Sequence, residues 1–195
     1  MVNMQTELSE KDALRAHPES GCPALVLADQ VLLCVNYVTF SGNEDAGQII
    51  VHKDVADDIK KVFDLIYKIK FPLAKVIPIA HPRYLWDDEK SCDDNNSSAF
   101  NYRKIAGLDK LSNHSFGLAV DLNPVQNPYI RYDESGNEVF RAPASAVYDK
   151  EIPGTLYAGH PVVVLFNDLG WEWGGDWTRE MGRTDYQHFE KHISS

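Results

Sequence analysis

Two short segments, SNHSFGLAVD and DYQHFE, carry side chains that can bind a metal ion. His114 and Asp121 lie in the first segment, and His188 would add a third ligand from far along the chain. Two imidazoles and one carboxylate suit Zn²⁺, and three protein ligands leave a fourth position for water, as catalytic zinc sites require. The net charge of about +1 at such a site lowers the pKa of bound water toward ~7. By spacing alone, each residue is more often a satisfied polar side chain than a ligand.

The elements that must position these residues are expected to be a helix beside several antiparallel strands, which is an α+β fold. The segment 54–69 has apolar residues at steps of three and four, which indicates a helix with one buried face. Alternating or apolar runs predict strands. The expected strands are 32–40 with QIIVH as a hairpin partner, 75–80, 118–122 and 185–192; a short helix is expected over 161–169.

The long segment 123–158 holds a possible hairpin around Ser135 and Gly136. Connections of this length in a compact domain are often lids or binding loops. Whether it closes over the metal site is left open by the sequence.

The length, composition and net charge of the chain limit its domain organisation and the classes of partner that it can bind. The chain has 195 residues and no internal repeat, so we expect an N-terminal tail or extension over 1–30 and a single domain over 31–195. The net charge of −10 disfavours nucleic-acid binding. No apolar run approaches the ~20 residues of a membrane helix. The N-terminus lacks a signal-peptide core, so the chain as written is expected in the cytoplasm, or in the periplasm or outside the cell if it has been trimmed.

Three cysteines, Cys22, Cys34 and Cys92, have spacings that fit no zinc pair and are expected to be idle or buried thiols.

The segment SNHSFGLAVD matches the S-x-H-x-x-G-x-A-x-D signature of the D-alanyl-D-alanine carboxypeptidase family of zinc peptidases. GWEWGGDW followed by D-x-x-H-F-E resembles the second motif of this family, and FPLAKVIPI and NNSSAFNYR resemble earlier parts. The resemblance covers about residues 31–192. It implies the fold shared with lysostaphin and the hedgehog signalling domain, in which a small antiparallel sheet has helices packed on one side and zinc at the sheet.

The resemblance also implies roles for the metal-site residues. His114, Asp121 and His188 would hold zinc, and Asp185, three residues before the last histidine, would be the general base. Many relatives have Glu at the position of the base, whereas the cell-wall endopeptidase branch often has Asp. The alternative for Asp185 is a loop carboxylate or a partner of a ligand.

Two further residues match positions that contact substrate in the family. Arg103 would stabilise the oxyanion or grip a substrate carboxylate, and its alternative is a surface arginine. Ser112 would help to bind substrate, and its alternative is a hydroxyl that forms a turn.

For other side chains near the motifs, the sequence supports a role at the site less strongly. Three tryptophans could wall the site or belong to the core. Glu190 lies two residues beyond His188 and would point to the same face of a strand, where it could orient a ligand. His160 could cap the helix that begins at Pro161. The tryptophans are Trp171, Trp173 and Trp177.

The implied function is a zinc metallopeptidase that hydrolyses peptidoglycan stem peptides or muropeptides. The first candidate activity is that of a D-alanyl-D-alanine carboxypeptidase. The alternatives are an L-alanyl-D-glutamate endopeptidase of the endolysin kind and a non-catalytic zinc-containing binding module. The bond that is cut and the oligomeric state are left open.

Overall fold

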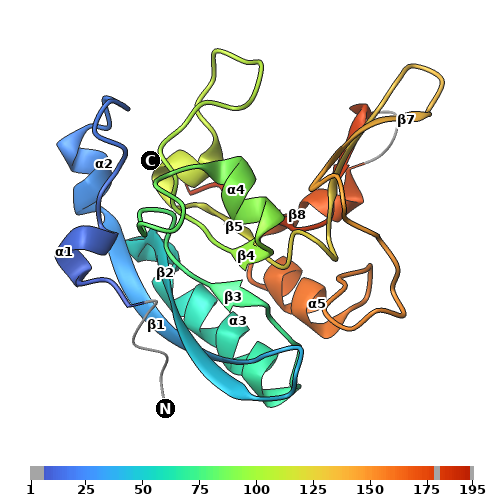
Figure 1. The fold of residues 1–195 in the computed structure, drawn as a ribbon, viewed down its shortest axis with the longest axis horizontal. Coiled ribbons are helices and arrows are strands. Elements are labelled where there is room, and N and C mark those ends of the chain that lie inside the picture. Colours follow the sequence, from blue (N-terminus) through green and yellow to red (C-terminus); the bar gives the residue numbers. More distant parts are fainter. Residues whose placement is uncertain (1–6, 178–180, 194–195) are drawn as a thin grey trace.

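The computed structural model describes residues 7–177 and 181–193, and within them short strands form four small sheets with helices beside them (Figure 1). The expected α+β class is confirmed. The prediction of one small antiparallel sheet is wrong in detail, because the strands divide among several sheets and one pair, β3 with β4, is parallel. In the described part of the chain, every helix is too short or too polar to span a bilayer.

The largest strands form a hairpin that carries the main core. β1 (Gln30–Val38) pairs antiparallel with β2 (Glu44–His52), so the turn is shorter than the sequence suggested. Helix α3 (Ala56–Lys68) packs on one face of this hairpin, after the short helix η1 (Lys53–Val55). The expected period is confirmed, since the buried residues of α3 follow steps of three and four. They are Ala56, Ile59, Val62, Phe63 and Ile66.

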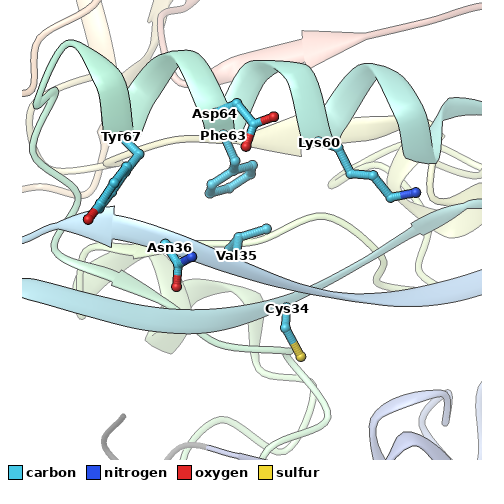
Figure 2. A pocket seen from close by; sticks show the side chains of 7 residues that line it. All are labelled: Cys34, Val35, Asn36, Lys60, Phe63, Asp64 and Tyr67. Carbon is cyan, nitrogen blue, oxygen red and sulfur yellow. The ribbon is translucent and has the colours of Figure 1, made fainter. Parts of the chain in front are cut away.

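A small pocket of about 110 Å³ opens between α3 and β1 (Figure 2). Lys60, Asp64 and Tyr67 line it from the helix, and Cys34 and Asn36 line it from the strand. None of the expected metal ligands lies among its lining residues.

The N-terminal segment covers the opposite face of the hairpin. α1 (Glu10–Ala13) and α2 (Ala24–Ala28) lie on the side of β1 away from α3 (Figure 1). Ala13 is fully buried and packs in one cluster with Ile50 and Phe100. The segment before residue 30 therefore shields apolar surface of the hairpin, while the proposed domain boundary stays a prediction.

The predicted strand 75–80 is wrong beyond its second residue. β3 (Lys75–Val76) pairs in parallel with β4 (Asn96–Ser97) and then stops. The buried side chain of Asn96 replaces the next step of the ladder, because it accepts a hydrogen bond from the Ile77 N–H at 2.9 Å and donates one to the Ile77 carbonyl at 2.8 Å. Helix α4 (Asp88–Asp93) lies just before β4.

The predicted last strand, 185–192, is two strands in two different sheets. β9 (Arg183–Asp185) ends where the chain turns, and β10 (His188–Glu190) begins three residues later. β10 lies between β5 (Ala119–Asp121) and β8 (Glu172–Trp173) in one antiparallel sheet. The break matters because it places Asp185 and His188 on separate sheets that meet at the site.

The other antiparallel sheet contains the hairpin expected near Ser135 and Gly136. β6 (Tyr129–Tyr132) pairs with β7 (Glu138–Ala142) on one side and with β9 on the other. Helix α5 (Pro161–Asp168) follows the long segment and packs against α3. The His160 side chain accepts a hydrogen bond from the Val162 N–H, so its expected role as a cap is confirmed.

A buried asparagine ties the two ends of the long segment together. The Asn127 amide group donates to the carbonyls of Leu122, Asn123 and Gly154, and its oxygen accepts from the Leu156 N–H at 2.7 Å. Its relative exposure is 0%. The start and the end of the segment are thus fixed to each other through one side chain.

We expect Asn127→Ala to lower the free energy of unfolding by about 2–3 kcal/mol, because several buried polar groups lose their partner. Chemical denaturation followed by tryptophan fluorescence measures the change. Asn137→Ala removes an exposed turn contact to Asp133 and serves as the control, with a loss below about 1 kcal/mol. Equal losses for the two variants would contradict the structural role of Asn127.

Candidate metal centre

The backbone brings three ligand side chains together from two distant segments. Asp121 on β5 and His188 on β10 are direct register partners across the sheet. His114 lies in the short helix η2 (Asn113–Phe116), where the Ser112 hydroxyl accepts a hydrogen bond from its N–H. Gly117 ends η2 with a φ of 67°, a left-handed conformation that glycine adopts without strain, and the chain turns directly into β5.

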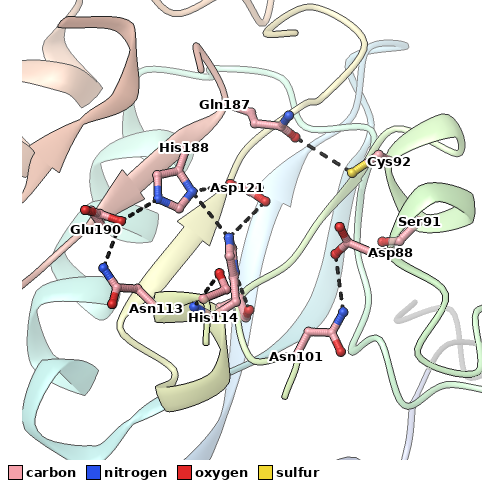
Figure 3. A network of polar contacts seen from close by, with 12 residues as sticks. Asp88, Ser91, Cys92, Asn101, Asn113, His114, Asp121, Gln187, His188 and Glu190 are labelled. Atoms are coloured by element: carbon pink, nitrogen blue, oxygen red, sulfur yellow. Dashed lines mark hydrogen bonds and ion pairs between the residues drawn. The ribbon is translucent and has the colours of Figure 1, made fainter. Parts of the chain in front are cut away.

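The three side chains converge with the spacing of a tetrahedral zinc site (Figure 3). Nε2 of His114 lies 3.3 Å from Nδ1 of His188 and 3.2 Å from Oδ2 of Asp121. Nδ1 of His188 lies 3.0 Å from Oδ1 of Asp121. Ligands about 2.0 Å from a tetrahedral zinc ion are about 3.3 Å apart, so the donor set fits this ion.

Hydrogen bonds on the far side of each imidazole fix which nitrogen faces the centre. Nδ1 of His114 lies 2.6 Å from the Ala99 carbonyl, and Nε2 of His188 lies 3.0 Å from Glu190. Both partners only accept, so each ring donates its N–H outward and directs the lone pair of its other nitrogen inward. The expected role of Glu190 as an orienting partner is confirmed, and Asn113 holds this carboxylate through a bond of 2.8 Å.

The electrostatics of the group point to a cation. Burial alone would lower the pKa of His188, but hydrogen bonds from this ring to Asp121 and Glu190 raise it to about 10. Burial opposes ionisation of Asp121, yet the two imidazoles outweigh it and hold its pKa well below the usual range. The pocket therefore stabilises positive charge at its centre, as a proton or as a metal ion.

Asp185 lies next to this group, at the end of β9, and its carboxyl group has a raised pKa. Burial raises the pKa of its carboxyl to about 7; the charge of His188 lowers it, and that of Asp121 adds to the rise. Its Oδ1 atom is enclosed and accepts no hydrogen bond from the described residues. A methyl group on Gly174 would approach the Asp185 carbonyl oxygen to 2.5 Å and the His188 Cβ atom to 3.3 Å, so a glycine at this position allows Asp185 and His188 to lie close together.

The substrate residues implied by the resemblance have structural partners of their own. The Arg103 guanidinium pairs with Asp88 at 2.8 Å, and its Nε atom is enclosed without a partner in the described part of the chain. Ser112 is the N-cap of η2 and is buried. The observed contact of the Ser112 hydroxyl is therefore the one expected of a turn-forming serine. That Arg103 and Ser112 contact substrate stays a prediction.

Cys92, which no sequence motif linked to the metal ligands, borders the site. Cys92 on α4 lies within electrostatic reach of Asp121, Asp185 and Arg103, and burial together with these carboxylates raises the pKa of its thiol. Its Sγ atom lies 3.9 Å from Oε1 of Gln187 (Figure 3). The polar segment SCDDNNSSA had no pattern that could place the thiol there.

The three tryptophans separate into two environments. Trp171 and Trp173 are buried in the main core. Trp177 is half-buried, and its ring lies 5.5 Å from the His188 ring, tilted by 45°. Of the three, Trp177 has the ring contact with a residue of the candidate centre, and all three line a hollow of about 240 Å³.

A buried cation site of two imidazoles and a carboxylate, with a second carboxylate beside it, is typical of metal-dependent hydrolases. The sequence model of the D-alanyl-D-alanine carboxypeptidase family matches residues 106–191, so this part of the chain is similar to that family. The match contains all three ligands and Asp185, whereas Arg103 lies before it. No curated protein and no solved structure matches the chain.

We expect Glu190→Gln to weaken zinc binding about 10- to 100-fold, because His188 loses the carboxylate that fixes its tautomer and raises its basicity. Competition with a chromophoric chelator measures the dissociation constant. Glu151→Gln is the control, since Glu151 is an exposed glutamate that belongs to no group of possible metal ligands in the described chain. Unchanged affinity in Glu190→Gln would show that Glu190 does not support the ligand.

We expect Gly174→Ala to retain zinc while losing activity about 100-fold, because the added methyl group displaces the backbone and side chain of Asp185. Zinc content and turnover are measured on the same preparation. Gly159→Ala is the control; it has a φ of 87° but no atom within 4 Å of the added methyl group. Its stability will fall with activity unchanged, and full activity in Gly174→Ala would contradict the placement of the base.

Proposed function

We propose that this protein is a zinc-dependent peptidase that removes the terminal D-alanine from peptidoglycan stem peptides. The observation that carries the proposal is the pair of inward-facing imidazole lone pairs beside Asp121, with the partly exposed carboxylate of Asp185 next to them. The match of residues 106–191 supports the peptidase class and a peptidoglycan-derived substrate at the level of the family. We also propose the hedgehog-type arrangement for the fold.

The chemistry follows from the positions of the side chains. A zinc ion held by His114, Asp121 and His188 would polarise the scissile carbonyl and make water more acidic. Asp185 accepts a proton from the attacking water and later donates it to the leaving amine. The hydroxyl oxygen becomes part of the new carboxylate, the C–N bond breaks, and the amine leaves with the proton.

Arg103 is the proposed stabiliser of the developing oxyanion. Its ion pair with Asp88 uses one terminal nitrogen of the guanidinium, and the enclosed Nε–H has no partner among the described residues. The Arg103 side chain is 30% exposed, so part of the guanidinium group can reach a substrate oxygen, and one such bond is worth about 3 kcal/mol in the transition state.

An L-alanyl-D-glutamate endopeptidase is the second candidate. The aspartate at position 185, rather than the glutamate of many relatives, resembles the endopeptidase branch. A non-catalytic binding module is disfavoured, because the carboxylate suited to act as a base is present and its pKa of about 7 suits proton transfer near neutral pH.

Product analysis by mass spectrometry distinguishes these candidates. We expect the zinc-loaded protein to release D-alanine from muropeptides ending in D-Ala-D-Ala, and a chelator to abolish the reaction. Asp185→Asn will lower the turnover rate by about 10²–10⁴-fold with zinc retained, because the amide cannot accept the proton. Asp64→Asn, an exposed carboxylate on α3, is the control with unchanged turnover.

Cleavage between L-alanine and D-glutamate would favour the endopeptidase, and zinc retention without cleavage of any muropeptide would favour the binding module. The pH profile adds a further check on Asp185. The base must be ionised, so kcat/KM will fall as the pH drops through the pKa of Asp185, at or below about 7, since bound zinc can only lower it.

A further inference from the structure

Two arginines lie side by side one step from the base. On the ladder between β6 and β9, Tyr129 is the register partner of Asp185, and Arg131 is the register partner of Arg183. Residues two apart on a strand point to the same face, so both arginines share a face with Asp185. The intervening pair, Ile130 and Thr184, is buried against the opposite face.

Each guanidinium group lies over an aromatic ring. Arg131 lies 4.4 Å from the centre of the Phe140 ring, and Arg183 lies 4.4 Å from the centre of the Trp177 ring. Stacking of this kind fixes the plane of the guanidinium and leaves its N–H groups free at the edge. Trp177 also contacts His188, so one ring connects Arg183 with the metal centre.

The two arginines lack the partners that other arginines of this chain have. Arg83, Arg103 and Arg141 each pair with a carboxylate at 2.5–2.8 Å. Within residues 7–177 and 181–193, no ion pair is formed by Arg131 or Arg183. Like charges directly opposite each other in a sheet destabilise it.

The chain has 29 acidic residues and a net charge of −10, so carboxylates are abundant, yet none neutralises this pair in the described structure. An anion bound between the two guanidinium groups would remove the repulsion. Planar forks in fixed orientation suit a carboxylate, which can accept paired hydrogen bonds from each.

We propose that Arg131 and Arg183 bind a free carboxylate of the substrate next to the scissile bond, which makes them specificity-determining residues. This inference depends on the proposed peptidase function. Two residues along β9 span about 6.6 Å, while one residue of extended substrate spans about 3.5 Å, so long arginine side chains can reach a carboxylate one residue beyond the bond that Asp185 serves.

Such a carboxylate has two sources in the proposed substrate class. It is the C-terminal carboxylate when the last residue is released, or the α-carboxylate of a glutamate that is linked through its side chain. Both sources present the same chemistry at the same short distance from the scissile bond, so the experiment includes both.

Calorimetric binding to zinc-loaded Asp185→Asn, which holds substrate without cutting it, tests the proposal. The ligands are a peptide ending in D-Ala-D-Ala with a free carboxylate, the same peptide as its C-terminal amide, and an L-Ala-γ-D-Glu peptide with its α-carboxylate free or amidated. We expect one carboxylate form to bind at least about tenfold tighter than its amide. The pair that shows the difference identifies the source.

Adding Arg183→Gln or Arg131→Gln is expected to abolish the preference for the carboxylate while leaving the affinity for the amide unchanged. Arg183→Lys keeps the charge but loses the fork, and will retain part of the preference. Arg15→Gln, an exposed arginine on the N-terminal segment, is the control with an unchanged preference. Thermal melting verifies that each variant is folded.

The proposal is overturned if carboxylate and amide bind equally, if neither binds, or if the arginine variants keep the preference. It is also overturned if folded arginine variants lose both ligands equally. The proposed function can fail independently of this inference. If the arginines are required for the carboxylate preference but the protein with Asp185 intact cleaves none of the peptides, this inference stands and the proposed function is rejected.

Discussion

The candidate site depends on one constraint: the imidazoles of His114 and His188 and the carboxylate of Asp121 are buried with their facing atoms within 3.3 Å of one another. Such groups repel unless a cation lies between them, and they must also be held from behind. The Ala99 carbonyl and the Glu190 carboxylate provide that support by accepting the outward N–H groups. The register of β5 with β10 is equally necessary, because a slip of one residue would turn His188 to the other face.

The sequence was a reliable guide where a local pattern carries the information. The apolar period of α3 and the cap at His160 depend on neighbours within one or two turns, and both predictions were confirmed. The convergence of the three ligands agrees with the roles implied by the family motif, and composition or spacing alone could not have supplied it. Glu190 could be placed because alternation along a strand fixes which residues share a face.

The sequence failed where long-range contacts override local preference. The segment around Asp185 and His188 has the pattern of one strand, but its two halves pair with different sheets. The apolar run after Lys75 leaves the ladder because the Asn96 side chain satisfies the backbone there instead. Cys92 approaches the centre only through the packing of α4, for which no short-range signal exists.

The N-terminal segment that covers the outer face of the β1–β2 hairpin also could not be predicted from local sequence patterns. Polar residues dominate the first twenty positions, and only the burial of Ala13 beside Ile50 and Phe100 reveals what they cover. An antiparallel pair with apolar side chains on both faces needs a layer on each side. Helix α3 supplies one layer, and the N-terminal segment supplies the other.

The metal centre also joins parts of the chain that are distant in sequence, since Asp121 and His188 are 67 residues apart. A bound ion would act there as a reversible cross-link between the two segments, and it would stabilise the folded chain by its binding free energy, because the site exists only when both segments are in place. A backbone cut at the exposed tip of the β6–β7 hairpin would fall between the two segments. The two fragments would then remain associated through the β5–β10 pairing and through the ion that both fragments bind.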